Sequence, residues 1–505
     1  MTIFNQRFKD SPIVQPRTLM LLFGWMVPAI ILLGVLSVTF EPALAVAAAI
    51  GLCVAAYMFV RPTATTMIVM FALYANLMVV AIRSYGVPEL LAGSFLLLLG
   101  LPFLNYTMIQ GKKIVVNRVL IMMVVYLGLV LTSAAISERP DESVDRLIGL
   151  VTEGIALYFL IINTIRTPKM LRRAVWTIVL AGMFMGSISL YQEITKDYDN
   201  DFGGLAVVKD AEISTGEVDA FGDDVKRQRL AGPVGSKNRY AQIMVVLFPM
   251  AIFFFFYEKS WYLKMLAIAA TIPIISGALL TFSRGAGISI ILTLLAMVAL
   301  RTIKVRQFIL IGLFATAVVL VAIPDYVYRL GRSAGVLELA QGNAADAGGS
   351  VRGRATVNLA AFNIFLDNFL LGVGPGQTKF YTTEYGNAVG YRHLSGSRRA
   401  HNMFLEEMAD TGILGFGTFM GIVGFTLWKL FRLRMRWKYR NPQVVFLVSG
   451  IMLAILAYLS TAVFLHLSYV RYYWVIIAIG GAAIEVFSDP KYRRKLKVGQ
   501  KPGRV

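Results

Sequence analysis

Long uninterrupted apolar runs are the feature that most restricts the fold of this 505-residue chain. The runs are roughly 17 to 22 residues long, about the length that a helix needs to cross the hydrocarbon core of a bilayer. They lack the alternating pattern of a membrane β-barrel strand, so each is predicted to be a helix. A hydrophobic content of 57% and a mean hydropathy of +0.66 agree with this. The chain is therefore predicted to be an all-α polytopic membrane protein.

About fourteen transmembrane helices are predicted, at 19–40, 42–60, 63–82, 87–109, 117–136, 147–165, 174–191, 240–257, 265–282, 286–300, 307–323, 412–430, 443–464 and 472–487. The first is predicted to be retained, although Ala43-Leu44-Ala45 mimics a signal-peptidase site, because its apolar core exceeds the usual ~7 to 15 residues. The runs 265–282 and 286–300 are interpreted as two short passes. A single helix over both would span roughly 54 Å, which exceeds a bilayer core.

The net charge of +20 is explained by topology rather than by nucleic-acid binding. With the N-terminus in the cytoplasm, alternate short connections collect the basic clusters, as the positive-inside rule requires. These clusters lie at 7–17, 112–118, 166–173, 301–306, 429–440 and in the tail after 488. The acidic stretch ERPDESVD falls on the opposite side. No nucleic-acid partner is expected, and the single Cys53 excludes disulfides and cysteine metal sites within the chain.

Two long connections divide the chain. The predicted organisation is helices 1 to 7 in 1–191, a periplasmic loop at 192–239, helices 8 to 11 in 240–323, a large periplasmic loop at 324–411, and helices 12 to 14 with a basic cytoplasmic tail in 412–505. Long loops in compact proteins are commonly functional. The second loop is predicted to be partly helical, because apolar residues recur at helical spacing from 354 to 371 before the glycines of GVGPGQ.

His401 is the first candidate for chemistry, since it is one of three histidines and lies where the second loop meets the membrane. A neutral imidazole near cations has a lowered pKa and can accept a proton at neutral pH. The competing interpretation, a polar residue that caps the next helix, carries about equal weight. Supporting candidates are Asn402, Arg398, Arg399, Glu406, His466 and Arg471. His393 lies in a glycine- and serine-flanked stretch and is a weaker candidate.

Arginines in the outer loops are candidates for binding phosphate. Arg229 precedes the eighth predicted helix, Arg284 occupies the tight turn TFSRGAG, and Arg354 opens the loop helix, with Arg352 as a competitor. Several converging guanidinium groups would bind a pyrophosphate bidentately. Outer-loop arginines are more often solvated or bound to lipid headgroups. A metal at Asp199, Asp201, Asp223 and Asp224 is a minor alternative, and no GxSxG, Walker A or HExxH motif occurs.

Four of these stretches together resemble the O-antigen ligase and O-antigen or exopolysaccharide polymerase superfamily of bacterial inner-membrane proteins. HNMFLEEMADTG, from His401, is similar to the family's histidine motif. RLAGPVGSKN resembles its arginine-glycine-asparagine signature, and TFSRGAG resembles its Ser-Arg-Gly turn. Arg354 precedes LLGVGPG as the family's loop arginine precedes its Gly-x-Gly. The four occur in family order across about residues 225 to 430. The chain departs at Lys237, where the family often has proline.

The resemblance implies a membrane glycosyltransferase with a GT-C-like fold in the bacterial inner membrane, its active site facing the periplasm. The donor would be an undecaprenyl-pyrophosphate-linked glycan and the acceptor a lipid-linked repeat unit or lipid A-core, in a membrane-lipid setting. His401 would be the general base, and Arg229, Arg354 and Arg284 would bind the pyrophosphate. The reaction would be inverting and metal-independent, without a cofactor.

The acceptor stays open between a polymerase, which is slightly favoured, a ligase, and a protein O-oligosaccharyltransferase. A rival from another class is a lipid-linked oligosaccharide flippase. Such a transporter predicts charges along a path through the membrane and two related halves. Here mid-helix charges are few, with Glu153 the clearest, and most candidate residues lie in outer loops. An enzyme is therefore the favoured interpretation.

Overall fold

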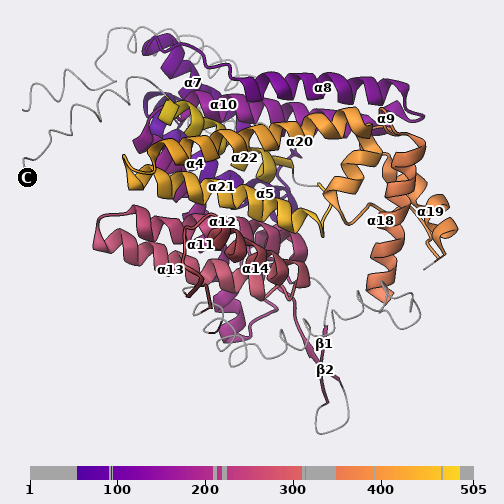
Figure 1. The fold of residues 1–505 in the computed structure, drawn as a ribbon. Coiled ribbons are helices and arrows are strands. Elements are labelled where there is room, and N and C mark those ends of the chain that lie inside the picture. The colour runs from indigo at the N-terminus through magenta and orange to yellow at the C-terminus, as the bar shows by residue number, and fades with distance from the viewer. Residues whose placement is uncertain are drawn as a thin grey trace, which may run out of the picture.

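A computed structural model describes residues 54–89, 93, 95–208, 213–218, 224–306, 308, 309, 313, 349–390, 393–467 and 470–488. This part of the chain is almost entirely helical (Figure 1). It contains eight helices long and apolar enough to cross a membrane, or up to nine if the bent pair Val54–Val60 and Pro62–Tyr74 forms one span. The prediction of a polytopic helical membrane protein is confirmed, whereas the count of fourteen spans is not.

The first half of the described chain forms a group of helices on one side of the bundle. It comprises α4 (Pro62–Tyr74), α5 (Leu77–Tyr85), η1 (Phe95–Leu99), α7 (Gly100–Leu104), η2 (Asn105–Ile109), α8 (Arg118–Ile136), α9 (Pro140–Gly149), η3 (Leu150–Ala156), α10 (Leu157–Thr164) and α11 (Pro168–Thr195). Helices α9, η3 and α10 form one continuous span. Helix α8 packs on α20, and α10 packs on α22, so this half supports the helices that follow the second loop.

The second half contains the central helices. An antiparallel hairpin of β1 (Ile213–Val218) and β2 (Asp224–Arg227) and the short turn η4 (Gly232–Val234) precede α12 (Lys237–Tyr257), α13 (Trp261–Leu279) and α14 (Arg284–Ala299). After a gap come α18 (Gly349–Asp367), α19 (Thr378–Val389), α20 (Met403–Trp437), α21 (Pro442–Ala462) and α22 (Val470–Ser488). Helix α12 packs against α21, α13 and α11. Among the eight candidate membrane spans, α12 and α22 have the largest buried share.

Local sequence signals set where the helices begin. Side chains of Asn117, Thr167, Asn402 and Asn441 accept hydrogen bonds from the first free backbone N–H groups of α8, α11, α20 and α21. Proline occupies the first turn of α4, α9, α11 and α21, where its missing N–H costs nothing. Such signals are local, so they act before tertiary packing and fix the ends of the spans.

Several predicted boundaries need correction. The span 63–82 is broken between α4 and α5 at Asn76, which has a φ of 60°. The segment 87–109 is described only as the short apolar helix Phe95–Ile109. The acidic stretch ERPDESVD is not a loop but the start of α9, because Pro140 and the following acidic residues favour a helix N-terminus. The predicted segments 19–40 and nearly all of 307–323 lie outside the described residues.

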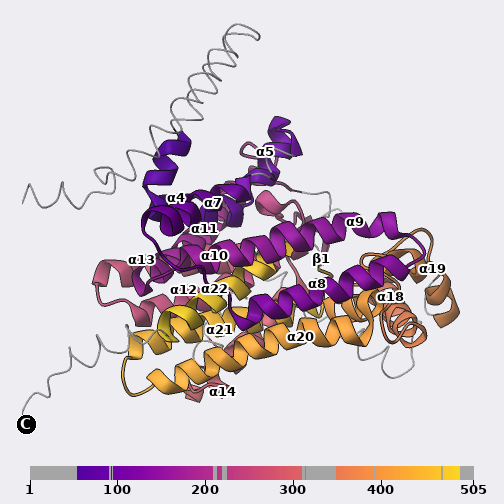
Figure 2. The same cartoon turned by 90° about the horizontal axis from the view of Figure 1, so that it is seen from above.

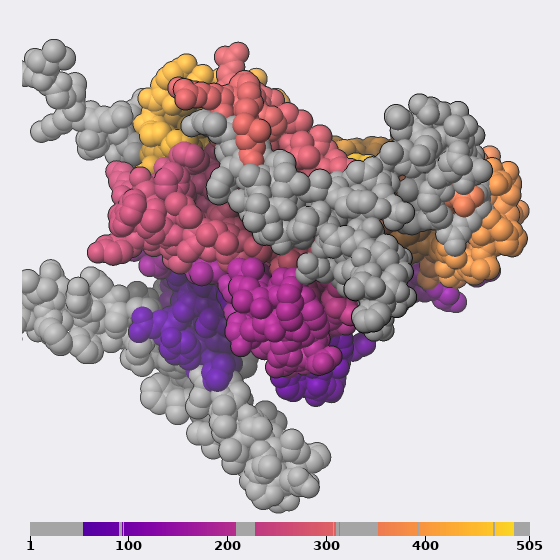
Figure 3. Space-filling view, turned by 90° about the horizontal axis from the view of Figure 1, so that it is seen from below, coloured from indigo at the N-terminus to yellow at the C-terminus, as the bar shows by residue number. Residues whose placement is uncertain are grey.

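The connections separate into two sets at opposite ends of the bundle. At one end, four hydrogen bonds each join a pair of connections. The pairs are Arg166 with the carbonyl of Lys113, Arg172 with Glu258, Gln443 with the carbonyl of Tyr257, and Arg434 with the carbonyl of Leu300. At the other end lie α18 and α19, with α18 running across the end of α20 (Figures 1 and 2). Figure 3 shows α18 and α19, in orange, as one end of the molecule. The predicted basic connections that the structure describes, at 112–118, 166–173, 301–306 and 429–440, share the first end, and the candidate site residues share the second.

Candidate active site

His401 lies immediately before α20 and is tied to the loop helix α18. Its backbone N–H donates to Asn358 Oδ1 at 3.2 Å. The Asn402 side-chain oxygen accepts from the N–H groups of Phe404 and Leu405, at 2.9 and 3.3 Å. That oxygen therefore fixes the start of α20 rather than the imidazole of His401. Because α18 and α20 both hold this point, the position of His401 depends on how the second loop docks.

The electrostatic surroundings of His401 favour its neutral form. Its pKa is lowered from the ordinary value, first by partial desolvation and next by the positive charge of Arg354, with a smaller effect of Arg398. Glu406 acts in the opposite direction. His401 is an exposed residue, so a substrate hydroxyl can reach it. A neutral, accessible imidazole is the form that a general base requires.

A second imidazole, that of His466, lies beside His401. The two ring centroids are 6.3 Å apart, and His466 comes from the turn between α21 and α22. Burial lowers the pKa of His466 to about 3, and the charge of Arg239 adds to this effect. His466 is thus neutral at physiological pH. The structure brings together two histidines that lie 65 positions apart in the sequence.

Three arginines from three elements hold the turn that carries His466. Arg239 of α12 donates to the carbonyl of His466. Arg146 of α9 and Arg399 of the second loop donate to the carbonyl of Leu467, at 2.6 and 3.2 Å. Glu406 links the last two, because its carboxylate accepts from Arg399 Nε at 2.7 Å and lies 3.5 Å from Arg146 Nη2. We call these four residues the turn clamp.

Two members of the turn clamp were missed by the sequence analysis. Arg239 occupies the first turn of an apolar span and Arg146 precedes another apolar run, so both carry a charge where burial is costly. An ionisable residue inside a membrane helix is a signal of a functional or structural role. That signal was present in the sequence, but their shared target on the 466–467 turn appears only when distant helices are packed.

Arg354 and Arg284 are near enough for their charges to interact. The pKa of Arg354 is lowered, first by burial and then by the charge of Arg284. Arg354 is also among the charges that act on His401. Within the part of the chain that the structure describes, no hydrogen bond or ion pair engages either guanidinium group. Two neighbouring cations without a carboxylate partner form a site for an anion.

Arg352, the competitor of Arg354, is not coupled in this way. Its Nε is buried without a hydrogen-bond partner among the described residues, but it does not act on His401. The electrostatic link to both Arg284 and His401 therefore favours Arg354 as the loop arginine.

Arg229 is buried and supports the turn from which Arg284 projects. Its Nε donates to the carbonyl of Thr281 at 2.7 Å, and its Nη2 donates to Asn238 Oδ1 at 3.2 Å. The backbone N–H of Leu230 adds a bond to the carbonyl of Leu280 at 3.2 Å. The arginine-glycine-asparagine stretch and the Ser-Arg-Gly turn are thus one structural unit. Arg229 acts on Arg284 through the backbone.

Glycines join the GVGPGQ stretch to the start of α20. Gly372 and Gly412 pack backbone against backbone, and a Cβ on Gly412 would lie 2.4 Å from the carbonyl carbon of Leu370. The N–H of Val373 donates to the carbonyl of Ala409 at 2.9 Å. The Asp410 carboxylate accepts from the N–H groups of Gly376 and Thr378, at 2.8 and 3.0 Å. We call this contact the glycine lock.

Other predicted residues lie outside this arrangement. Arg471 pairs with Glu153 at 3.0 Å and donates to Asn76 Oδ1 at 2.5 Å, so it joins three helices. Asp201 accepts the N–H of Gly203 within a turn. Among the described residues, no group of three or more His, Cys, Asp or Glu side chains is placed to hold a metal ion. The acidic segment around Asp223 lies outside the described residues.

Comparison with known proteins identifies a region that contains Arg284, Arg354 and His401 but not Arg229, Arg239 or His466. Residues 269–420 match the O-antigen ligase family. A relative is the teichuronic acid biosynthesis protein TuaE of Bacillus subtilis (strain 168), 24% identical over 147 residues. That match covers 28% of this chain and 29% of the relative. The resemblance to the O-antigen ligase and polymerase superfamily is confirmed by these matches.

Proposed function

Because residues 269–420 match the O-antigen ligase family, we propose that this protein is a glycan transferase of the bacterial inner membrane whose active site faces the periplasm. The observation that carries the proposal is that the charge of Arg354 acts on the exposed His401, while the charge of Arg284 acts on Arg354. A base and an anion site at one point suit transfer of a glycan from a pyrophosphate to a hydroxyl. The multi-pass helical fold and the family match support a lipid-linked substrate.

The donor is proposed to be an undecaprenyl-pyrophosphate-linked glycan. Arg354 and Arg284 would contact its phosphate oxygens, since guanidinium groups bind phosphate in a planar, bidentate geometry. Their charges also stabilise the negative charge that develops on the leaving pyrophosphate. Arg229 would keep Arg284 in place without touching the donor. This set of contacts supports a reaction without a metal ion.

The acceptor hydroxyl is proposed to be activated by His401. As its oxygen attacks the anomeric carbon, the bond from that carbon to the pyrophosphate oxygen breaks and the bond's electron pair leaves with the pyrophosphate. The hydroxyl proton passes to the neutral ring of His401. Attack from the side opposite the leaving group inverts the configuration at the anomeric carbon. His466 would stand beside this hydroxyl as a second neutral imidazole.

A second lipid-linked repeat unit is the proposed acceptor, which makes the protein a polymerase. The relative named for teichuronic acid biosynthesis supports polysaccharide assembly as the setting. A ligase that uses lipid A-core is the alternative. The two differ in the acceptor alone, so the same base and anion site serve either reaction.

Replacement of His401 by alanine tests the proposal. Loss of a positioned base costs about 10²- to 10⁴-fold in rate, so purified, monodisperse His401→Ala should bind a lipid-pyrophosphate glycan but not transfer it. The control is His393→Ala, in the same loop, which should keep full transfer. EDTA should leave the parent activity unchanged. Transfer by His401→Ala within a few-fold of the parent would overturn the assignment of the base.

A further inference from the structure

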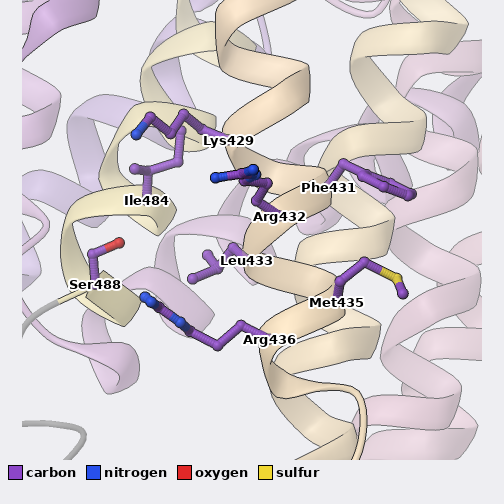
Figure 4. A pocket seen from close by; sticks show the side chains of 8 residues that line it. All are labelled: Lys429, Phe431, Arg432, Leu433, Met435, Arg436, Ile484 and Ser488. Atoms are coloured by element: carbon purple, nitrogen blue, oxygen red, sulfur yellow. The ribbon is translucent and has the colours of Figure 1, made fainter.

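A second cationic site lies at the far end of α20 from His401. A pocket of about 410 Å³ is formed between α20 and the last turns of α22 (Figure 4). Lys429, Arg432 and Arg436 line it, and Figure 4 shows their charged ends directed toward α22, where Ser488 lies. Their spacing of three and four residues places them on one face of the helix. The pocket is roughly 40 Å from His401 along α20.

Among the described residues no ion pair engages Lys429, Arg432 or Arg436, although the charge of Lys429 acts on the carboxylate of Glu485. Two of the three make cation–π contacts, since Lys429 Nζ and Arg432 Cζ each lie 4.9 Å from the centroid of the Trp428 ring. An adjoining pocket of about 310 Å³ contains Lys429, Arg118 and one carboxylate, that of Glu485. Positive charge is therefore in excess around Ser488, and a concave cationic site of this kind attracts an anion.

The remaining walls of the pocket are apolar. Leu433, Ile484 and the helix positions of Phe431 and Met435 line it, and Figure 4 shows the side chains of Phe431 and Met435 directed away from α22 and from the cations. Phe431 and Met435 are 42% and 45% exposed and add apolar surface of the candidate membrane span beside the pocket. A ligand that satisfies both parts of the wall carries a phosphate and an acyl chain. A free phosphate ion would leave the apolar walls without a partner.

We propose that this pocket binds the headgroup of an anionic phospholipid in the leaflet opposite the candidate active site. The guanidinium groups of Arg432 and Arg436 bind the phosphodiester oxygens, and Lys429 adds a point charge. The acyl chains follow the apolar side chains of α20 and α22. Basic pockets between helices on the cytoplasmic side suit such headgroups. The bound lipid would bridge α20 and α22 and so stabilise their contact.

Native mass spectrometry of the delipidated full-length protein tests the proposal. The probes are phosphatidylglycerol and phosphatidylcholine with identical acyl chains. The parent should retain phosphatidylglycerol in preference, and Lys429→Gln/Arg432→Gln/Arg436→Gln should reduce this preference at least about fivefold. The single variant Arg436→Gln, at an exposed position, should show a smaller loss in the same direction and serves if the triple variant is not monodisperse.

A charge-matched control separates the pocket from general attraction. Arg173→Gln/Lys259→Gln/Arg440→Gln removes the same charge from exposed residues that do not line the pocket, and it should keep the preference. An equal loss in this control would overturn the proposal. Displacement of the lipid by millimolar inorganic phosphate would also overturn it and assign a free-phosphate site. Phosphatidylglycerol should raise the melting temperature of the parent and of the control variant, but not that of Lys429→Gln/Arg432→Gln/Arg436→Gln.

Discussion

At the scale of single residues, the arginines near the candidate site differ in what their guanidinium groups contact. Among the described residues no hydrogen bond or ion pair engages Arg354 or Arg284, so their guanidinium groups can bind an anion. Arg239 and Arg399 hold backbone carbonyls of the 466–467 turn. Arg471 forms an ion pair with the carboxylate of Glu153. The arginines near the candidate site are therefore not equivalent, although all carry the same charge.

The pH dependence of transfer follows from the surroundings of His401. The base is active when neutral, so activity should fall as pH drops through its pKa. Partial desolvation and then Arg354 and Arg398 lower that pKa, so this acid limb should lie below the ordinary value of 6.5. Arg398→Gln should move the limb to higher pH, because one of the lowering charges is removed. Lys379→Gln, whose side chain pairs with Glu142, should leave it in place. A pH profile of kcat/KM measures both, and an unmoved limb in Arg398→Gln would contradict this account.

Lysine substitutions distinguish arginines that contact the donor from one that supports the fold. Arg354→Lys and Arg284→Lys keep the charge but lose the planar fork, so transfer should fall at least about tenfold with little change in melting temperature. Arg229→Lys breaks buried bonds to backbone carbonyls, so it should also lower the free energy of unfolding by about 2 kcal/mol. The readouts are donor turnover and thermal unfolding in detergent. An unchanged melting temperature for Arg229→Lys would show that it does not hold the turn.

At the scale of elements, the end of the bundle that holds the candidate site is assembled by contacts between segments that are separate in sequence. The glycine lock joins the end of α18 to the start of α20, and Gln377 extends the contact to α8 and α9 through Ser137 and Ser143, at 2.7 and 2.9 Å. The turn clamp joins α9, α12 and α20 to the α21–α22 turn. His401 lies where the two contacts meet, so its position is set by both.

Gly412 should be the most sensitive glycine of α20. It has φ 63° and ψ −170°, a backbone conformation that favours glycine, and a Cβ there would clash with the backbone at Leu370. Gly412→Ala should therefore lower the free energy of unfolding by about 1–3 kcal/mol and reduce transfer, because the glycine lock opens. Gly417→Ala is the matched control, since nothing lies within 4 Å of its Cβ position in the same helix. Equal melting temperatures for the two variants would contradict the role of the glycine lock.

At the scale of the whole molecule, function is divided between two ends of one bundle. The candidate active site lies at the end with α18 and α19, and the lipid pocket lies at the end with the basic connections (Figure 1). The central helices α12, α21 and α22 separate them. Positive charge is present at both ends, but at the first it converges on one histidine, whereas at the second it is spread over several short connections.

Accessibility labelling tests the orientation of the two ends. In a Cys53→Ser background, Ala388→Cys in α19 should react with an impermeant maleimide applied to intact spheroplasts. Lys259→Cys, at the exposed turn between α12 and α13, should react only after permeabilisation. The physical reason is the positive-inside rule, which assigns the basic connections to the cytoplasm. Labelling of Lys259→Cys from outside would reverse the orientation and move the site to the cytoplasm.

Local patterns predicted much of this protein because they do not depend on distant contacts. The length of the apolar runs identified the long helices. The short runs on either side of residues 283–285 predicted a turn there. The predicted helix start at 412 coincides with the break in α20, since Gly412 has φ 63° and ψ −170° within the element that begins at Met403. The turns from Met403 to Thr411 were missed, because the Asn402 cap and the buried partner of Glu406 stabilise a helix that hydropathy does not register. Broken segments such as α4 and α5 were missed, since hydropathy does not register a backbone break at Asn76.

The sequence by itself determined the membrane class, the sidedness prediction and the residue types available for chemistry, since hydropathy and charge act residue by residue. It also contained His401, Arg284 and Arg354 in recognisable stretches. Only the tertiary structure decided which of these meet. It placed His466 beside His401, directed Arg229 to a backbone turn, and recruited Arg146 and Arg239 to the turn clamp. A guanidinium group has the same chemistry everywhere along a chain, and packing alone determines whether its partner is a carbonyl, a carboxylate or a substrate.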